Sequence, residues 1–318
     1  MAGLIFSAYD TEEKEIAVSN VLSYELSKDE DAVCHGLRLY FISKVPLPEL
    51  FMLRAKNNGT IVFNGYVDTQ RETSDEKGTV CFVFARSTAC VLLDNEAKPQ
   101  VYFKPTAEAL FLSNAKGLGF LSDLPEIVGD TDYQVDKGKS CYAAINDFVY
   151  NLTGKSMVVD IDNHIKLRED GTKRNVDSAD IISVKRIINR GGIICRLDCK
   201  TDESEDYTYH FKSKYFENKK ILTSKKQNIS NMSLYRRQYA LKNILEKSAA
   251  DYFTYEIRVN GSWNGDLYDL VEIDDSFFGS TDDCVVSSLR YSMNDSGTET
   301  KIVLRKKTDL EEITYVAE

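Results

Sequence analysis

The chain has 318 residues, of which 42% are hydrophobic, so it is long and apolar enough for two or three domains that each bury a core. Its net charge of −10 argues against a protein that binds nucleic acid by neutralising phosphates. With 18 Tyr and 15 Phe but only five Pro, the composition favours a strand-dominated fold and excludes a disordered chain.

The sequence shows no targeting or membrane-spanning segment. Residues 1–5 lack the basic start and long apolar core of a signal peptide, and no apolar run approaches the ~20 residues of a membrane helix. The seven Cys residues are odd in number and lie mostly in apolar stretches, which is typical of reduced core thiols. We therefore expect a protein that is made and kept in a cytoplasm, without membrane insertion.

The N-terminal third has the pattern of a β-meander. Alternating apolar positions predict strands near 4–8, 16–26, 37–41 and 49–55. A hairpin follows, with Gly65 in its first strand as the sign of a bulge or bend. Its second strand, 80–84, is apolar on both faces, which predicts a strand covered on both sides. Ser87 is placed to cap a short helix over 88–94, before Pro99.

Residues 102–175 have a mixed pattern, which predicts a small α/β domain. A short helix is expected over 106–112. A clear amphipathic helix follows, with Ser140 at its start and Gly154 as its stop. A hairpin over 157–167 completes this region.

From residue 176 the chain returns to strands, and we expect a second barrel that extends to residue 318. Three strands are predicted to form a meander, at 181–188, 193–199 and 206–212. A helix over 231–253, without Gly or Pro, is the longest expected in the protein. Four further strands are predicted at 255–259, 267–273, 284–291 and 301–306. The predicted domains are 1–101, 102–175 and 176–318, and the third repeats the architecture of the first without a visible repeat in the sequence.

Several short motifs suggest chemistry but lack the residues that it requires. Residues 138–140 and 154–156, both Gly-Lys-Ser, end like a phosphate-binding loop, yet neither has the first Gly of that motif. Residues 160–164 begin like a calcium loop, but Ile165 stands where the sharp turn needs Gly, and Gly171 where a bidentate acid is needed. A hairpin turn is the better interpretation of this segment.

Cysteine, histidine and acidic residues likewise predict no metal or catalytic site. Cys195 and Cys199 share one predicted strand face without a second Cys/His pair, so we expect them in the core. The three His residues, His35, His164 and His210, lack the partners of a nucleophile. One acidic group could supply the carboxylate pair of a glycosidase but flanks a loop: Glu272, Asp274, Asp275, Asp282 and Asp283. We expect no enzyme activity, no cofactor and no metal.

Two basic clusters and one tryptophan remain to be explained. The clusters, at 212–226 and 305–307, have acidic residues beside them, and we interpret both as solvated faces. Trp263, the only tryptophan, lies in a loop between two predicted strands. It is expected either to cover the end of a barrel or to anchor an interface, since Trp is enriched at contact hot spots.

The predicted hairpin carries a recognisable pattern. Its first strand contains Gly-x-Val-Asp at 65–68, and its second ends in Ala-Arg-Ser at 85–87 and turns directly into a helix that ends at Asp94. This unit resembles one in the baseplate hub proteins of contractile phage tails: the Mu-type hub, the hubs of PBSX-like prophages and R-type bacteriocins, and the hub half of VgrG-type spikes. A Gly-x-x-Tyr-Asp-x-Val turn at 265–271 resembles one in the last barrel of the same family.

The resemblance implies a mainly β protein with two tube-like β-barrel domains and a small α/β insertion domain between them. It also implies a structural role, as a homotrimer that adapts the hexameric tail tube to the threefold central spike. The implied partners are the tail tube protein, the central spike protein and other baseplate or LysM-type tail proteins, with DNA at most passing through the lumen. The implied location is the baseplate of a virion or tail-like particle, assembled in the bacterial cytoplasm.

An argument from sheet edges leads to the same trimer. An open barrel has edge strands whose unpaired groups invite pairing. If the two barrels of one chain pair edge to edge, three chains can close a ring of six barrels, whereas a contact that does not close would grow into a fibre. Two alternatives remain open: a tail-tip peptidoglycan hydrolase, and the hub of a non-contractile tail, whose large C-terminal extension a chain ending at Glu318 would lack.

Overall fold

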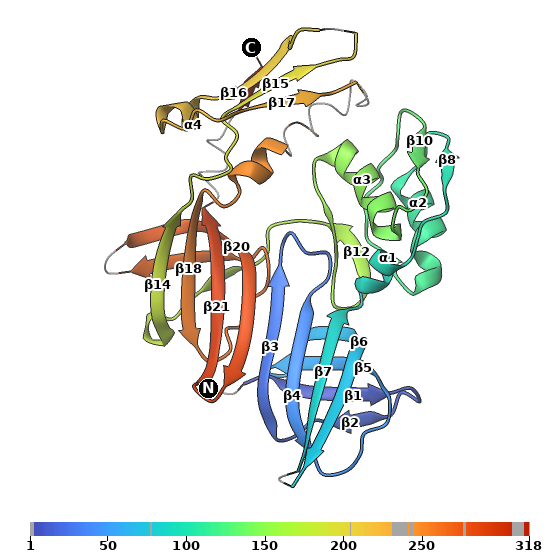
Figure 1. Cartoon of the computed structure of the whole chain (residues 1–318), viewed down its shortest axis with the longest axis vertical. Helices are drawn as coiled ribbons and strands as arrows, with labels where there is room; N and C mark the ends of the chain where they lie inside the picture. The colour runs from blue at the N-terminus through green and yellow to red at the C-terminus, as the bar shows by residue number, and fades with distance from the viewer. Residues whose placement is uncertain are drawn as a thin grey trace.

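The structure, a computed structural model, describes residues 3–76, 78–203, 205–230, 241, 244–275, 278–306 and 315–317. Strands dominate these residues, and most of the helices gather in one region (Figure 1). The predicted mainly β fold is therefore confirmed. The chain consists of two barrels, a small α/β domain and a separate four-stranded sheet.

The first barrel is built from consecutive antiparallel strands. They are β1 (Ile5–Asp10), β2 (Glu15–Ala17), β3 (Val21–Asp29), β4 (Gly36–Ser43), β5 (Leu50–Asn57), β6 (Thr60–Asp75) and β7 (Gly78–Ser87). They pair in the order β3-β4-β7-β6-β5-β1-β2. In β4 buried and exposed side chains alternate, which places Leu37, Leu39 and Phe41 in the core, as the period of two predicted.

Gly65 marks a close approach of two strands in this barrel. A Cβ at this position would lie 2.2 Å from the carbonyl oxygen of Arg86, so a side chain here would force β6 and β7 apart. β6 does contain a bulge, but the register against β7 shifts at Asp68, three residues beyond Gly65, which itself pairs regularly with both neighbouring strands.

Among the described residues no second layer covers the outer face of β7, so the prediction of a strand covered on both sides is wrong. Cys81 and Val83 point into the core, whereas Phe82 and Phe84 are only half-buried. The guanidinium group of Arg71 stacks over Phe82, 4.4 Å from the ring centroid. Long cationic side chains cover these rings, which is why a strand apolar on both faces can lie at the surface.

The middle domain has its own core, formed by residues from Leu92 to Ile165. Its elements are α1 (Cys90–Asp94), β8 (Gln100–Tyr102), α2 (Ala107–Asn114), β9 (Leu121–Ser122), β10 (Tyr133–Val135), α3 (Cys141–Thr153), β11 (Met157–Val159) and β12 (His164–Leu167). As predicted, Ser140 caps α3 by accepting a hydrogen bond from the backbone of Ala143, and Gly154 ends the helix at φ 71°.

The start of α1 differs from the prediction. Its N-cap residue is Ala89, and no side chain caps the helix. Ser87 belongs to β7 instead, and its hydroxyl accepts a hydrogen bond from the backbone N–H of His35 at 3.0 Å. The expected capping role of Ser87 is therefore wrong, because β7 continues three residues beyond the predicted apolar strand and places this side chain beside the neighbouring turn.

The second barrel combines strands that are far apart in the sequence. They are β13 (Lys173–Asn175), β14 (Ile181–Ile188), β18 (Phe253–Asn260), β19 (Leu270–Asp275), β20 (Gly279–Asn294) and β21 (Gly297–Lys306), paired in the order β14-β18-β21-β20-β19-β13. The observed bounds of β14 are those that the sequence predicted.

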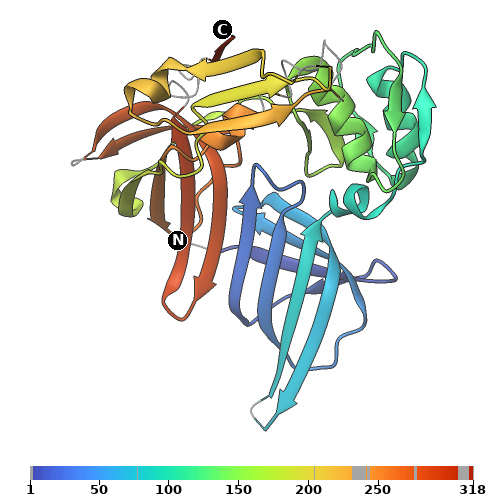
Figure 2. The same cartoon turned by 45° about the horizontal axis from the view of Figure 1, so that its top comes forward.

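A four-stranded sheet, three of whose strands interrupt this barrel in sequence, lies beyond one end of it in space (Figures 1 and 2). It contains β15 (Arg196–Lys200), β16 (Tyr209–Ser213), β17 (Ser224–Asn228) and β22 (Tyr315–Ala317), with α4 (Lys214–Asn218) beside them. The meander predicted over 181–212 is therefore wrong, because β14 pairs with β18 and not with β15. The exposed Lys225 and Lys226 on the edge strand β17 fit the predicted solvated face.

Most of the helix predicted over 231–253 lies outside the described residues. Residues 244–249 are helical, and β18 begins at Phe253, where the helix was expected to end. Leu241 and Leu245 pack on Leu197 of β15, so this segment covers the small sheet and not the barrel.

Candidate assembly interface

The two barrels of one chain join edge to edge, as the edge argument predicted. Residues 24–29 of β3 pair antiparallel with residues 288–293 of β20, and this ladder merges both barrels into one sheet of 13 strands (Figure 1). The interiors of the two barrels belong to one apolar cluster, to which Leu26 and Tyr291 contribute from opposite sides of the ladder. A backbone ladder with a shared core makes the two barrels a single unit.

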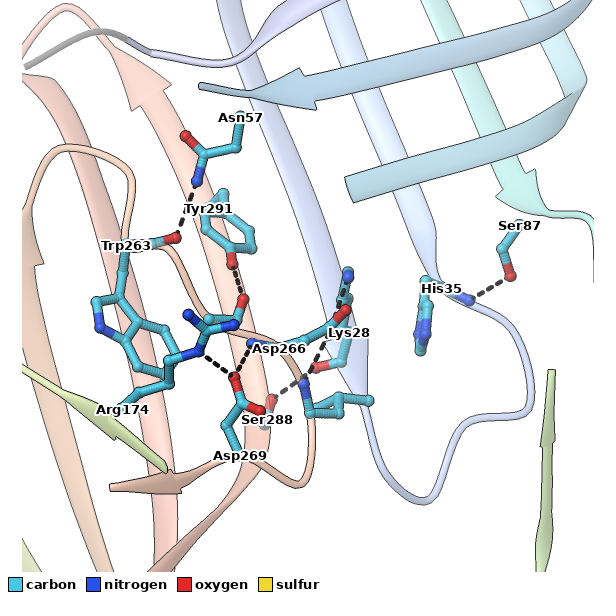
Figure 3. A network of polar contacts seen from close by, with 12 residues as sticks. Lys28, His35, Asn57, Ser87, Arg174, Trp263, Asp266, Asp269, Ser288 and Tyr291 are labelled. Atoms are coloured by element: carbon cyan, nitrogen blue, oxygen red, sulfur yellow. Dashed lines mark hydrogen bonds and ion pairs between the residues drawn. The ribbon is translucent and has the colours of Figure 1, made fainter. Parts of the chain in front are cut away.

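Partly buried polar contacts support this ladder on the side of the loop between β18 and β19 (Figure 3). Lys28 is 4% exposed, and its Nζ donates to Oδ1 of Asp266 at 2.8 Å. Burial opposes ionisation of Asp266, but the Lys28 ammonium outweighs it and holds the pKa of the carboxyl below its ordinary value. Ser288 donates to the carbonyl of Lys28 at 3.2 Å, so Lys28 is held through both its side chain and its backbone.

Trp263 lies in the core at the same junction. Its side chain is 9% exposed, and its Nε1 donates to the carbonyl of Asn175 at 3.4 Å. Its own carbonyl accepts a hydrogen bond at 3.0 Å from the buried Asn57 of the first barrel (Figure 3). Gly265 leaves room for the indole, since a Cβ there would lie 2.2 Å from the ring. Of the two roles expected for Trp263, covering a barrel end fits this position.

Glu30, in the turn after β3, joins three parts of the chain. Its side chain is 2% exposed, its Oε2 lies 2.6 Å from Nη2 of Arg168, and its Oε1 contacts Arg305 of β21. Arg305 also lies 3.5 Å from Asp251 and is only 13% exposed. The solvated face predicted at 305–307 is therefore wrong for Arg305, because a buried carboxylate requires a cation beside it.

The residues of the hairpin pattern form a second arginine clamp. Nε and Nη2 of Arg86 donate to the carboxylate of Asp68 at 2.5 and 3.0 Å, and Nη1 and Nη2 donate to that of Asp94 at 3.1 and 2.7 Å. Hydrogen bonds from Arg86 hold the pKa of Asp94 below its usual value. Two bidentate pairs of this kind connect β6 and β7 to α1. The residues of the hairpin pattern therefore fix the position of α1, the first helix of the middle domain, relative to the first barrel.

The histidines weighed as catalytic candidates lie in different parts of the molecule. His164 contacts Asp123 at 2.8 Å in the middle domain, and His210 contacts Asp198 at 2.6 Å in the small sheet. The half-buried His35 lies beside the barrel junction. The fold brings no two of them together.

The remaining candidates have structural roles where the structure describes them. Asp160 accepts hydrogen bonds from the backbone of Asp162 and His164 at 3.0 and 2.9 Å, and so forms the predicted hairpin turn between β11 and β12. Within the described ranges no three His, Cys, Asp or Glu residues are placed to hold a metal. Glu272 of the acidic group pairs with Lys173, whereas three side chains of the group lie outside the description: Asp275, Asp282 and Asp283.

Cys195 and Cys199 are buried, as predicted, but they belong to different clusters. Cys195 belongs to the cluster of Phe216, and Cys199 to that of Leu241. The expected shared strand face is wrong, because β15 begins only at Arg196.

Two small cavities flank the barrel junction. One, of about 180 Å³, is lined by Lys28, His35 and Asp266 together with residues of β6 and the β11–β12 turn. The other, of about 300 Å³, lies beside Trp263. Pockets that enclose a small ligand usually measure ~300–1,000 Å³, so the first cavity is too small for a typical ligand site and the second lies at the lower limit of that range. The polar groups at the junction serve to hold the two barrels together.

Comparison with solved structures shows the same fold in tail proteins. The 43 kDa tail protein of prophage MuSo2 from Shewanella oneidensis matches with a TM-score of 0.76 and 11% identity, over 98% of this chain and 100% of that one. The tail protein from Neisseria meningitidis MC58 matches with a TM-score of 0.75 and 15% identity, over 96% and 97%. A type VI secretion system component of Escherichia coli, similar in structure to the T4 tail proteins gp27 and gp5, matches with 0.58 and 8%, over 92% and 74%.

No protein-family model matches the sequence, and no curated protein does. Among the described residues, no helix combines the length and the apolar character that crossing a membrane requires.

Proposed function

We propose that this chain is the structural hub of the baseplate of a contractile tail or tail-like particle. The observation that carries the proposal is the edge-to-edge pairing of two barrels in a chain that shares its fold, over nearly its whole length, with phage tail proteins. A tube is a closed ring of repeated units. A chain that already holds two barrels in one ladder supplies two consecutive units of such a ring.

Three copies then close a ring of six barrels, which matches a sixfold tail tube on one side and a threefold spike on the other. The barrels form the wall of the ring. The middle domain and the small sheet both lie beyond the same end of the two barrels, which leaves them outside this wall (Figures 1 and 2). The proposed partners are the tube protein, the spike protein and other baseplate or LysM-type tail proteins, and DNA at most passes through the lumen.

Cryo-microscopy of the particle assembled in its own bacterial host tests this proposal. We expect density for three copies of the chain in one ring at the base of the tube, each copy contributing two barrels to the wall. Six copies per ring, one barrel per chain in the wall, or absence of the chain from the baseplate would overturn the proposal. A sheath around the tube in the same particles distinguishes a contractile from a non-contractile tail.

A separate assay distinguishes the hub from a tail-tip hydrolase. Purified protein is incubated with isolated peptidoglycan, beside a muramidase as positive control. We expect no release of soluble fragments above the buffer blank. Release that increases with protein concentration would favour the hydrolase.

A further inference from the structure

The two barrels contain the same hairpin, although the sequence hides it. β6 and β20 both have 16 residues, and β7 and β21 both have 10. The turns correspond, at 75–78 and 294–297, and each long strand shifts register at the same position, Asp68 in β6 and Ser287 in β20. The two hairpins therefore correspond residue by residue, although only five of their 28 residue pairs are identical.

The outermost strands correspond as well. β3 shifts register against β4 at Leu22, and β14 shifts against β18 at Ile182, which is the second residue of each strand. Both bulged residues expose an apolar side chain, 41% of Leu22 and 53% of Ile182. The strand order β3-β4-β7-β6 of the first barrel is thus repeated as β14-β18-β21-β20 in the second.

The contact within the chain shows which edges fit each other. Within the chain, β3 of the first barrel pairs with residues 288–293 of β20 in the second barrel. The counterpart of β3 in the second barrel is β14, and the counterpart of residues 288–293 in the first barrel is residues 69–74 of β6. Both counterparts have an open edge in the part of the chain that the structure describes: β14 pairs only with β18, and β6 pairs with β5 no further than Tyr66. On β14, Ile182 and Ile188 are each 53% exposed. An open edge with exposed apolar side chains favours pairing with another strand.

The loop beside β6 leaves this edge accessible. Glu72 accepts a hydrogen bond from the backbone of Leu47 at 3.5 Å, and its counterpart on β20, Tyr291, donates one to the carbonyl of Gly265 at 2.8 Å. In both barrels a neighbouring loop thus contacts the side chain and not the edge of the strand. In the second barrel this arrangement accommodates β3 beside β20.

We propose that β14 of one copy pairs antiparallel with residues 69–74 of β6 in the next copy, in the register that β3 and β20 show. This inference rests on the proposed ring and names the contact that closes it. When the register of the β3–β20 ladder is applied to β14 and β6, Arg186 lies opposite Glu72. The corresponding pair within the chain is Leu26 opposite Tyr291. Opposite charges that face each other across two antiparallel strands stabilise the pair, so this position favours the proposed neighbour.

Disulfide trapping tests the register. Residues directly opposite in an antiparallel ladder have Cα atoms ~4.5–5.5 Å apart, which a disulfide spans. Cys81 lies opposite Glu72 within the chain, so both pairs are made in a Cys81→Ala background. The variant with Glu72→Cys and Arg186→Cys should then give covalent dimers and trimers in oxidised particles. The control, Glu72→Cys with Lys185→Cys, is shifted by one residue, so its second side chain points to the other face of the sheet. The wild type, in which only Cys34 of the seven free thiols is not buried, measures background.

We expect at least a tenfold excess of cross-linked chain for the matched pair over the shifted pair, on non-reducing gels. Equal yields from the two pairs would overturn the inference. Copy number is counted in the same particles. Three copies per ring with no preference for the matched pair contradict only the proposed register, whereas a different copy number contradicts the hub proposal itself.

Charge reversal gives an independent measurement. Arg186→Glu and Glu72→Arg should each lower incorporation of the chain into particles roughly fivefold or more, because like charges then face each other across the ladder. The double variant should restore incorporation. Lys98→Glu, an exposed reversal in the middle domain, serves as the matched control. A double variant that is no better than either single variant would contradict the pairing.

Discussion

Glu30 makes the most deeply buried ionic contact of the barrel junction, and Glu30→Gln should destabilise the protein strongly. The Glu30 side chain is 2% exposed and touches two guanidinium groups, those of Arg168 and of Arg305, which is 13% exposed. Gln keeps the shape of the side chain but not its charge, so the buried Arg305 retains only the carboxylates of Asp251 and Asp31, which lie 3.5 and 3.8 Å away and are 75% and 69% exposed. Removing one partner of a buried ion pair costs about 3–5 kcal/mol of unfolding free energy.

Two further variants separate this cause from others. Glu25→Gln is the matched control on β3, because Glu25, 32% exposed, pairs with Arg38 at 3.1 Å and Arg290 at 3.7 Å, whose side chains are 58% and 55% exposed. Exposed pairs contribute about 0–1 kcal/mol, so this change should have little effect. The double variant with Glu30→Leu and Arg305→Met replaces the buried pair by apolar groups and should recover most of the lost stability.

Urea unfolding followed by the fluorescence of Trp263 measures these differences, because the single tryptophan lies at the junction. An equal loss from Glu30→Gln and Glu25→Gln would refute the argument that burial makes the Glu30 contact strong. A double variant no more stable than Glu30→Gln would show that the loss does not come from an uncompensated Arg305.

Two other predictions concern the same region. Gly265→Ala should lower the thermal midpoint, because a Cβ there meets the Trp263 ring at 2.2 Å, and overpacking costs about 1–3 kcal/mol. Gly117→Ala, in open space, should change nothing, and an equal loss from both would contradict this cause. Burial, and to a lesser extent the charge of Lys28, lowers the pKa of His35 from 6.5 to about 4. Between pH 4 and 6.5 the His35 imidazole is therefore protonated in the unfolded chain but not in the folded protein. Stability in urea should therefore fall by up to about 3 kcal/mol from pH 6.5 to 4, and an unchanged slope in His35→Gln would contradict the assignment.

Local elements of this protein could be predicted from the sequence because their signals act within a few residues. Ser140 and Gly154 bound α3 through a hydrogen bond and a left-handed φ that depend only on neighbouring backbone. The β11–β12 turn forms because the carboxylate of Asp160 accepts from the next residues along the chain. The bounds of β14 were likewise predicted, although partly buried and exposed residues do not alternate along this strand.

Only the tertiary structure decided which strands are neighbours. A period of two shows which face of a strand is buried but not which strand lies beside it, so β14 was placed beside β15 although it pairs with β18. The ionic contacts of the barrel junction could not be predicted for the same reason. Lys28 meets Asp266, and Glu30 meets Arg305, only after strands that are distant in the sequence have paired. The repeated hairpin could not be recognised in the sequence, because a barrel constrains strand length, bulge position and which side chains face its interior. It leaves the identity of most residues free.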